Sequence, residues 1–224
     1  MNNPPFKYYY RSIGCTMLLL LLCQSVFAHD VDLSSLSKSE VLSIYLQLGF
    51  THIIPLGFDH ILFVLSLYLL NPKLKPILWQ ATAFTVAHTI TLGLAMYQII
   101  KPPASIVEPV IALSIVYVAL ENIFSPRLKV SRIGVVFLFG LVHGMGFASA
   151  LTQLGLPQNS YLSSLLMFNL GVELGQITVI LAAFFLIGLP FSNKPFYRNK
   201  IVIPLSIIIA VIAAYWTVER FFLK

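Results

Sequence analysis

Residues 201–222 read IVIPLSIIIAVIAAYWTVERFF, with no charged side chain before Glu219. A helix of about 20 apolar residues is long enough to cross the roughly 30 Å hydrocarbon core of a bilayer. The stretch therefore predicts a transmembrane helix. Because it carries so little polar character, we expect this helix to face lipid or to pack against other helices.

Five more apolar runs precede this one, and short loops separate all six. The 224-residue chain is 58% hydrophobic and only 10% charged, whereas a soluble domain has about 25% charged residues, so an ordinary soluble protein is excluded. The runs are also too long and continuous for the strands of a β-barrel. The predicted fold class is all-α, a polytopic bundle of about six transmembrane helices. The runs span residues 52–70, 78–100, 105–124, 133–154, 161–189 and 201–222. The preceding segment has helix-capping serines and predicts a surface helix at about 39–48.

The N-terminal segment has the pattern of a secretory signal peptide. Lys7 and Arg11 precede a short apolar stretch, and Ala28 is a small residue before the expected cut. We expect residues 1–28 to be removed and residues 29–224 to form a single membrane domain. An uncleaved first helix is the alternative.

Cleavage after Ala28 would make His29 the new N-terminus. Its amine and imidazole could then bind a metal, or the histidine could simply follow the signal by chance. Both cysteines, Cys15 and Cys23, lie within the signal segment. The mature chain would therefore have neither a disulfide nor a thiolate metal site.

The basic residues predict the orientation in the membrane. With the mature N-terminus outside, the two outer loops carry only Lys101. The first, third and fifth loops carry Lys73, Lys75, Arg127, Lys129, Arg132, Lys194, Arg198 and Lys200. This is the positive-inside pattern of a bacterial inner-membrane protein, with both termini in the periplasm. The net charge of +6 is spread over loops, so we expect no nucleic-acid partner.

Ionisable residues inside the apolar runs are the candidates for function, because a charge at mid-bilayer costs at least about 2.5–3.5 kcal/mol on insertion scales. At about 1.5 Å per residue, five positions from four helices fall in one layer about 8 Å thick. The predicted metal ligands are Asp59, His60, His88, His143 and Glu173. Imidazole and carboxylate ligands favour a divalent nickel, cobalt or zinc ion, and the scarcity of sulfur ligands, with only Met145 and Met167 nearby, disfavours Cu(I).

Other polar residues are predicted to support this layer. His52 and Glu108 lie near the outer surface and could form an entrance, and Glu121 could form an inner step. Asn169 and Gln176 are expected to act behind the ligands or along the path. For any one of these residues, an interhelical hydrogen bond is the competing explanation. The spacings Gly140-x-x-x-Gly144 and Gly171-x-x-x-Gly175 allow close helix contacts, and we expect them to bring the fourth and fifth helices together.

Four motifs carry a resemblance to a known family. They are Gly57-Phe58-Asp59-His60-Ile61-Leu62-Phe63, Ala87-His88-Thr89-Ile90-Thr91-Leu92, Gly140-Leu141-Val142-His143-Gly144-Met145-Gly146-Phe147-Ala148 and Phe168-Asn169-Leu170-Gly171-Val172-Glu173-Leu174-Gly175-Gln176. Together they resemble the HupE/UreJ family, in particular its divergent second branch. The resemblance implies a nickel or cobalt permease of the hydrogenase and urease accessory type. Phe139 and Gly146 stand where those permeases have a histidine and a glutamate.

The sequence therefore predicts a membrane protein that binds a divalent transition metal at mid-bilayer and most simply passes it inward. The alternatives are an intramembrane zinc-dependent hydrolase built from the same residues and a helical scaffold for a periplasmic partner. The expected partners are the metal ion and the lipid bilayer. A homo-oligomer is compatible with the sequence.

Overall fold

A computed structural model describes residues 36–125, 131–148, 151 and 160–223. These residues belong to one compact unit, Leu36–Lys224. The predicted signal peptide, residues 1–28, and His29 lie outside the described residues.

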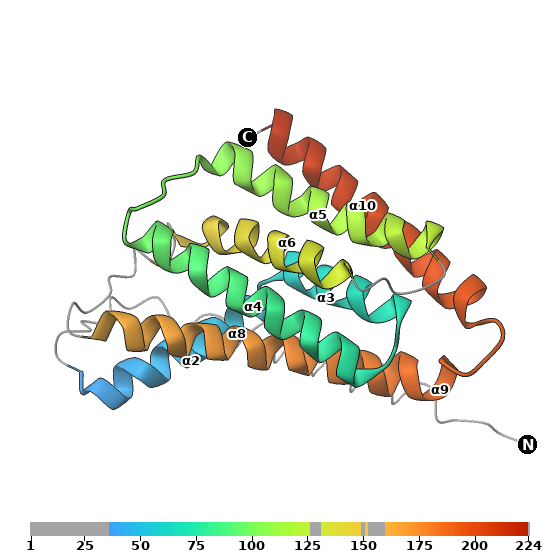
Figure 1. Cartoon of the computed structure of the whole chain (residues 1–224), viewed down its shortest axis with the longest axis horizontal. Coiled ribbons are helices and arrows are strands. Elements are labelled where there is room, and N and C mark those ends of the chain that lie inside the picture. The colour runs from blue at the N-terminus through green and yellow to red at the C-terminus, as the bar shows by residue number, and fades with distance from the viewer. Residues whose placement is uncertain (1–35, 126–130, 149–150, 152–159, 224) are drawn as a thin grey trace, which may run out of the picture. The chain divides into compact units, whose positions relative to one another are not determined.

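The described residues form helices and no strand, which confirms the all-α prediction (Figure 1). Two π-helical segments occur near the C-terminal end of the chain. η4 (Phe184–Gly188) continues α8 into α9, and η5 (Arg198–Val202) leads into α10. The α-helices are α2 (Lys38–Ile53), α3 (Phe58–Leu70), α4 (Leu74–Met96), α5 (Ala104–Phe124), α6 (Arg132–Gly146), α8 (Tyr161–Ala183), α9 (Leu189–Phe191) and α10 (Ile203–Phe222).

The predicted number of six spans is not confirmed. In the described part of the chain, 4 helices are long and apolar enough to cross a membrane, or 5 spans result if the bent pair α2 and α3 counts as one. The fourth predicted run, 133–154, is represented by α6, which has only 15 residues and ends at Gly146. At about 1.5 Å per residue, α6 is roughly 22 Å long, shorter than the hydrocarbon core.

The first predicted span, 52–70, is broken where α2 and α3 meet at 66°. Pro55 has no N–H to donate and disfavours helical geometry at the residue before it. Ile54 accordingly has φ −124° and ψ 116°, which is extended backbone, and α2 ends there. The break separates His52 from His60 and turns α3 away from the axis of α2.

The helix expected at about 39–48 is present as α2. α2 begins with a capping box between Ser37 and Glu40, as the serine signal predicted, but it continues to Ile53. It packs against α8 and buries one face, with buried residues Val41, Tyr45, Gly49 and Ile53. The fourfold spacing of these residues places them along one side of the helix.

The second predicted span, 78–100, begins and ends four residues earlier in the structure, as α4. Pro76 lies in its first turn, where a missing N–H costs no intrahelical hydrogen bond. At the other end Gln98 has φ 58°, a left-handed conformation that does not continue a helix. Pro76 was predicted to lie in the loop before this span, but it lies inside α4.

The most extensive contacts between helices join three pairs: α2 with α8, α4 with α6 and α5 with α10 (Figure 1). Glycines lie at the closest approaches. A Cβ on Gly144 would overlap the His88 carbonyl oxygen, and one on Gly171 would overlap the Leu46 carbonyl oxygen. The two glycine spacings thus fix α6 on α4 and α8 on α2, and do not join the fourth and fifth predicted helices to each other.

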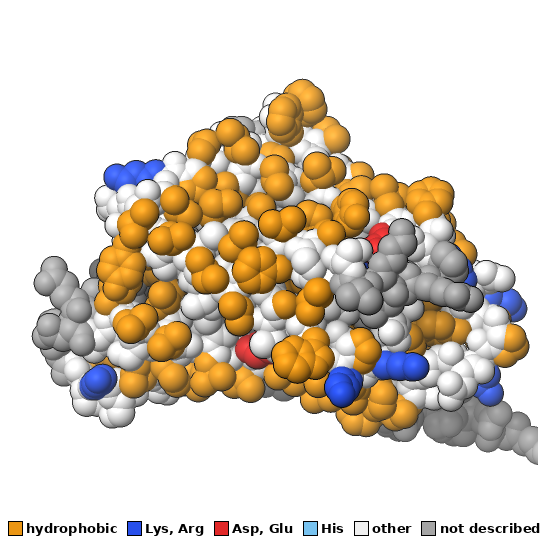
Figure 2. All heavy atoms as spheres, viewed as in Figure 1, with side chains coloured by type: hydrophobic (Ala, Val, Ile, Leu, Met, Phe, Trp, Pro, Cys, Tyr) orange, Lys and Arg blue, Asp and Glu red, His pale blue; other side chains and the backbone are white. Residues whose placement is uncertain are grey.

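The outer surface suits a lipid environment. Figure 2 shows hydrophobic side chains over most of the visible face, with Lys and Arg near its edges. α10 packs on α5 and exposes Ile207, Ile208, Val211 and Val218. The sixth helix therefore faces lipid and packs on a neighbour, as its composition indicated.

Candidate metal centre

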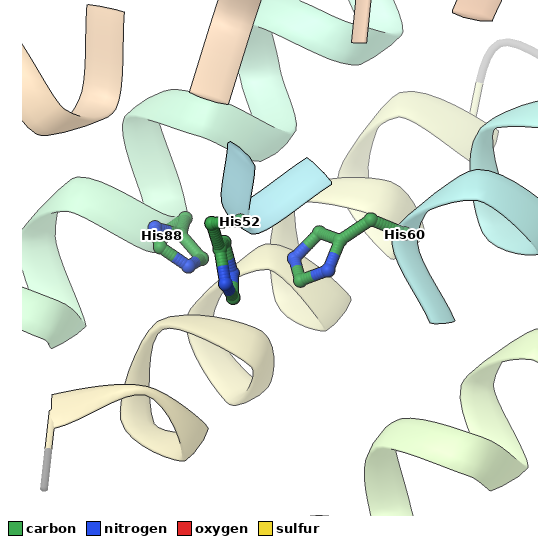
Figure 3. A group of neighbouring side chains, drawn as sticks. All are labelled: His52, His60 and His88. Atoms are coloured by element: carbon green, nitrogen blue, oxygen red, sulfur yellow. The ribbon is translucent and has the colours of Figure 1, made fainter. Parts of the chain in front are cut away.

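Three histidines from three helices meet inside the bundle. His52 lies in the last turn of α2, His60 in the first turn of α3 and His88 within α4. One ring nitrogen from each lies within 4.8 Å of the others. Figure 3 shows the His52 ring between the other two. Two nitrogens bound to one tetrahedral metal at about 2.0–2.1 Å lie about 3.4 Å apart, so the three rings would have to draw closer together to share one ion. The bend between α2 and α3 is what turns His52 and His60 toward each other.

His143 of α6 lies beside this group. Its ring centroid is 5.2 Å from that of His60, and it is 1% exposed. Gly144 lets α6 approach α4 at the level of His88, which is why a helix with so few residues delivers a histidine to this point. Four helices thus contribute one imidazole each.

Hydrogen bonds fix two of these rings through Nδ1. Nδ1 of His143 donates to the Phe139 carbonyl oxygen at 2.8 Å, because a carbonyl can only accept. Nδ1 of His88 lies 3.0 Å from Oδ1 of Asn169, whose own Nδ2 donates to the Leu165 carbonyl oxygen at 2.8 Å. That second bond turns the amide oxygen toward His88 and makes Nδ1 of His88 a donor. Both rings therefore present an Nε2 lone pair.

The Nε2 atoms of His52, His60, His88 and His143 are all buried and have no hydrogen-bond partner among the described residues. Buried polar atoms are nearly always paired, so four such nitrogens together need a physical reason. A metal bound through Nε2, with Nδ1 held by an acceptor behind it, is the usual arrangement of imidazole ligands. The arrangement can hold a borderline divalent metal.

Aromatic rings enclose the histidines. Phe147 lies 4.0 Å from His52, and Phe84 lies 4.9 Å from His143, between ring centroids. Phe63 lies 5.4 Å from His143 and is 1% exposed. These rings make the surroundings of the histidines largely apolar, which lowers the local dielectric constant and strengthens any ion–ligand interaction made there.

A cavity of about 430 Å³ connects this group to the side of the molecule where α2 and α3 meet. Exposed Leu56 of the bend lies at its edge. Its ionisable lining residues are His52, Asp59, His60, Glu108, His143 and Arg220. The expected entrance residues, His52 and Glu108, thus share one cavity with three of the predicted ligands.

The comparison with known proteins can now be stated. A family model described as HupE / UreJ protein matches residues 29–220. The chain belongs to the HupE/UreJ family. No curated protein and no solved structure matches it. The HupE/UreJ motif residues Asp59, His60 and His143 all line the cavity.

Asp59 has a partner that the sequence analysis did not find. Nη2 of Arg220, in the last turn of α10, lies 3.1 Å from both carboxylate oxygens of Asp59. Arg220 also lies over Trp216, one turn earlier in α10, with 5.4 Å between the guanidinium carbon and the ring centroid. The i,i+4 spacing of Trp216 and Arg220 was the sequence feature that could have indicated a fixed arginine. A charge so near the end of a transmembrane helix is more often a residue at the membrane interface.

Glu173 is not among the histidines in this HupE/UreJ structure. Its two oxygens accept hydrogen bonds from the hydroxyls of Thr82, at 2.7 Å, and Thr85, both on α4. It therefore joins α8 to α4 about one turn from the Asn169–His88 contact. Gln176, one turn further along α8, is buried, and its side-chain nitrogen and oxygen have no partner among the described residues.

Glu121 belongs to a separate polar network at the other end of α5 from Glu108. It forms an ion pair with Arg132, whose Nε is 3.4 Å away. Asn122 accepts from the same arginine at 3.3 Å and donates to the Ser66 carbonyl oxygen at 2.7 Å. Arg132 is only 2% exposed. The network ties α3, α5 and α6 together where the predicted inner step was placed.

Proposed function

We propose that this HupE/UreJ protein is a permease that binds a divalent transition metal, nickel or cobalt, and passes it toward the cytoplasm. The observation that carries the proposal is the set of four buried Nε2 atoms, from four helices, without hydrogen-bond partners in the described chain. In this proposal the ion is the cargo. It is held by His52, His60, His88 and His143, a purely imidazole set suited to nickel, cobalt or zinc.

The cavity supports entry from the outer side. A cation that enters there would exchange its waters for imidazoles deeper inside. A membrane potential of 100 mV, negative inside, contributes about 2.3 kcal/mol per charge to inward movement. The charge pattern of the loops supports an inner-membrane location with both mature termini in the periplasm. A cleaved signal peptide and an entry role for His29 belong to the same proposal.

The surroundings of the acidic residues favour transport over hydrolysis. A zinc hydrolase needs a carboxylate that is free to activate the metal-bound water. Asp59 is engaged by Arg220, and Glu173 by Thr82 and Thr85. A hydrolase would have to release one of these carboxylates first.

The test measures binding and uptake separately. Purified protein is titrated with Ni²⁺ and Co²⁺ by calorimetry, and vesicles are assayed for uptake of radioactive nickel. We expect His60→Ala, His88→Ala and His143→Ala each to lower affinity by more than the about 10–100-fold that loss of an outer hydrogen bond to a ligand costs.

The matched control is Thr178→Val, because among the described residues the Thr178 hydroxyl donates only to the Leu174 carbonyl oxygen of its own helix, at 2.8 Å. It should bind and transport like the parent. Parental affinity in the three histidine variants would contradict the proposal, and a parent without metal affinity would favour the scaffold alternative. Stoichiometric metal that does not exchange, with no uptake, would favour the hydrolase.

A further inference from the structure

A fixed positive charge lines the cavity through which the cargo would enter. Arg220 is held from three sides. Nη2 contacts both oxygens of Asp59, Nη1 lies 3.4 Å from the Glu108 carbonyl oxygen, and the guanidinium lies over the Trp216 ring. Arginine keeps its charge at any physiological pH. A cation placed permanently on the entry path opposes a divalent cargo, so its presence there needs a reason.

Ligand preference supplies that reason. Carboxylate oxygens are the preferred ligands of Mg²⁺, Ca²⁺ and Mn²⁺, whereas imidazoles suit nickel, cobalt and zinc. Without Arg220, Asp59 would offer its carboxylate oxygens as ligands at the mouth of the cavity. Hard cations would then bind there ahead of the histidines and block the path.

We propose that Arg220 is a specificity-determining residue: a built-in cation that occupies Asp59 and so prevents hard divalent cations from binding at the cavity mouth. The histidines then select the metal, because imidazoles are poor ligands for hard cations. A borderline metal passes the mouth without binding there, because the imidazoles beyond Asp59 supply the ligands that it prefers. This inference rests on the proposed function, since it concerns the selectivity of that path.

The first measurement does not depend on nickel binding. Mn²⁺ serves as the hard-cation probe, because its free ion gives an electron paramagnetic resonance signal that is lost on binding. We expect no Mn²⁺ binding at millimolar concentration by the parent protein and at least a tenfold gain in affinity in Arg220→Gln. The double variant Asp59→Asn/Arg220→Gln should lose the gain, because the exposed carboxylate is gone.

Lys101→Gln is the matched control. It removes one positive charge from the loop between α4 and α5 but does not line this cavity. It should leave Mn²⁺ binding at the parental level. Arg220→Lys should also reject Mn²⁺, because the cation beside Asp59 is retained. If Arg220→Gln does not purify, Arg220→Met carries the same test, since its side chain keeps the contact with Trp216 without a charge.

The second measurement is competition. Nickel binding by the parent should be unchanged by a thousandfold excess of Mg²⁺, and in Arg220→Gln the same excess should weaken it at least tenfold. Mn²⁺ binding by the parent at Asp59, or an Arg220→Gln variant that matches Lys101→Gln in both measurements, would overturn the inference. A parent that binds no nickel would overturn the proposed function instead and leave the Mn²⁺ comparison decisive on its own.

Discussion

The orientation of His88 depends on one amide. Asn169 accepts from Nδ1 of His88 and is itself anchored to the Leu165 carbonyl oxygen, so its side chain cannot rotate without losing both bonds. Such outer hydrogen bonds set which ring nitrogen carries the lone pair and where it points. The amide is thus expected to affect metal affinity without touching the ion.

We predict that Asn169→Ala weakens nickel binding about 10–100-fold, because the His88 ring loses its fixed tautomer and direction. Asn169→Asp keeps the acceptor for His88 but loses the bond to the Leu165 carbonyl oxygen, so it should weaken binding less than Asn169→Ala does. Glu173→Gln, one turn along the same helix, is the comparison: its carboxylate is held by two threonine hydroxyls and should matter less than Asn169. Calorimetry measures all three. A Glu173→Gln variant as weak as His88→Ala would instead make Glu173 a ligand, as the sequence predicted.

The histidines could be predicted from sequence because a buried imidazole in an apolar run has few explanations. The estimated depths of His60, His88 and His143 also agreed, which suggested one site, whereas His52 was predicted to lie near the outer surface as an entrance residue. Arg220 could not be predicted in this way, because contacts between α10 and α3 are not encoded in either segment alone. The same holds for Glu173, whose partners lie on α4 and leave no signal in the sequence around α8. Charge and depth thus locate a site, and tertiary contacts decide which charges are already paired.

Helix contacts at glycine determine how the histidine-bearing elements meet. α6 reaches α4 through Gly140 and Gly144. The residues around Gly144 include the His88 carbonyl oxygen and the Thr91 hydroxyl. Any side chain at this position must push α6 away from α4 and move His143 with it.

We predict that Gly144→Ala destabilises the protein by about 1–3 kcal/mol, the usual cost of overpacking, and lowers its thermal unfolding temperature in detergent. Gly134 in the same helix is the matched control, because an added Cβ would meet nothing within 4 Å. Gly134→Ala should be neutral or slightly stabilising, since alanine favours helix more than glycine does. Equal unfolding temperatures for the two variants would show that the close approach at Gly144 carries no energetic weight.

The long elements were predictable because about 20 apolar residues in a row have one common structural outcome. The interruptions were not. Pro55 ends a helix within a predicted span, whereas Pro76, which was predicted to lie in a loop, lies in the first turn of α4. The difference lies in the position of each proline within its turn. The glycine spacings predicted that helices would approach closely, but they could not name the partner, because each spacing fits any neighbour with a complementary face.

The distribution of charge describes the molecule as a whole. Basic residues gather at one end of the helices, where Arg198 caps the end of α5 through the Ile123 and Ser125 carbonyl oxygens, at 2.9 Å and 3.3 Å. The positive-inside rule assigns this end to the cytoplasm. Because α6 is short, whether it crosses the membrane decides if the number of spans is odd or even.

We predict that a reporter active only in the cytoplasm works when inserted after Ser125, before α6. A reporter active only in the periplasm should work between α6 and α8 and also after Lys224. This pattern requires α6 to cross the bilayer despite its length, through local thinning or the cover of its neighbours. Cytoplasmic activity on both sides of α6 would make it a re-entrant segment and would reduce the number of spans.

The bend between α2 and α3 has a mechanical consequence. His52 lies on one arm of this broken helix and His60 on the other, with ring centroids 4.7 Å apart. An ion bound by both rings would cross-link α2 and α3 and hold the angle between them fixed. Departure of the ion would remove this cross-link and allow the angle to vary. Binding and release of the ion would then change the rigidity of the whole helix pair, including the end of α2 farthest from the histidines.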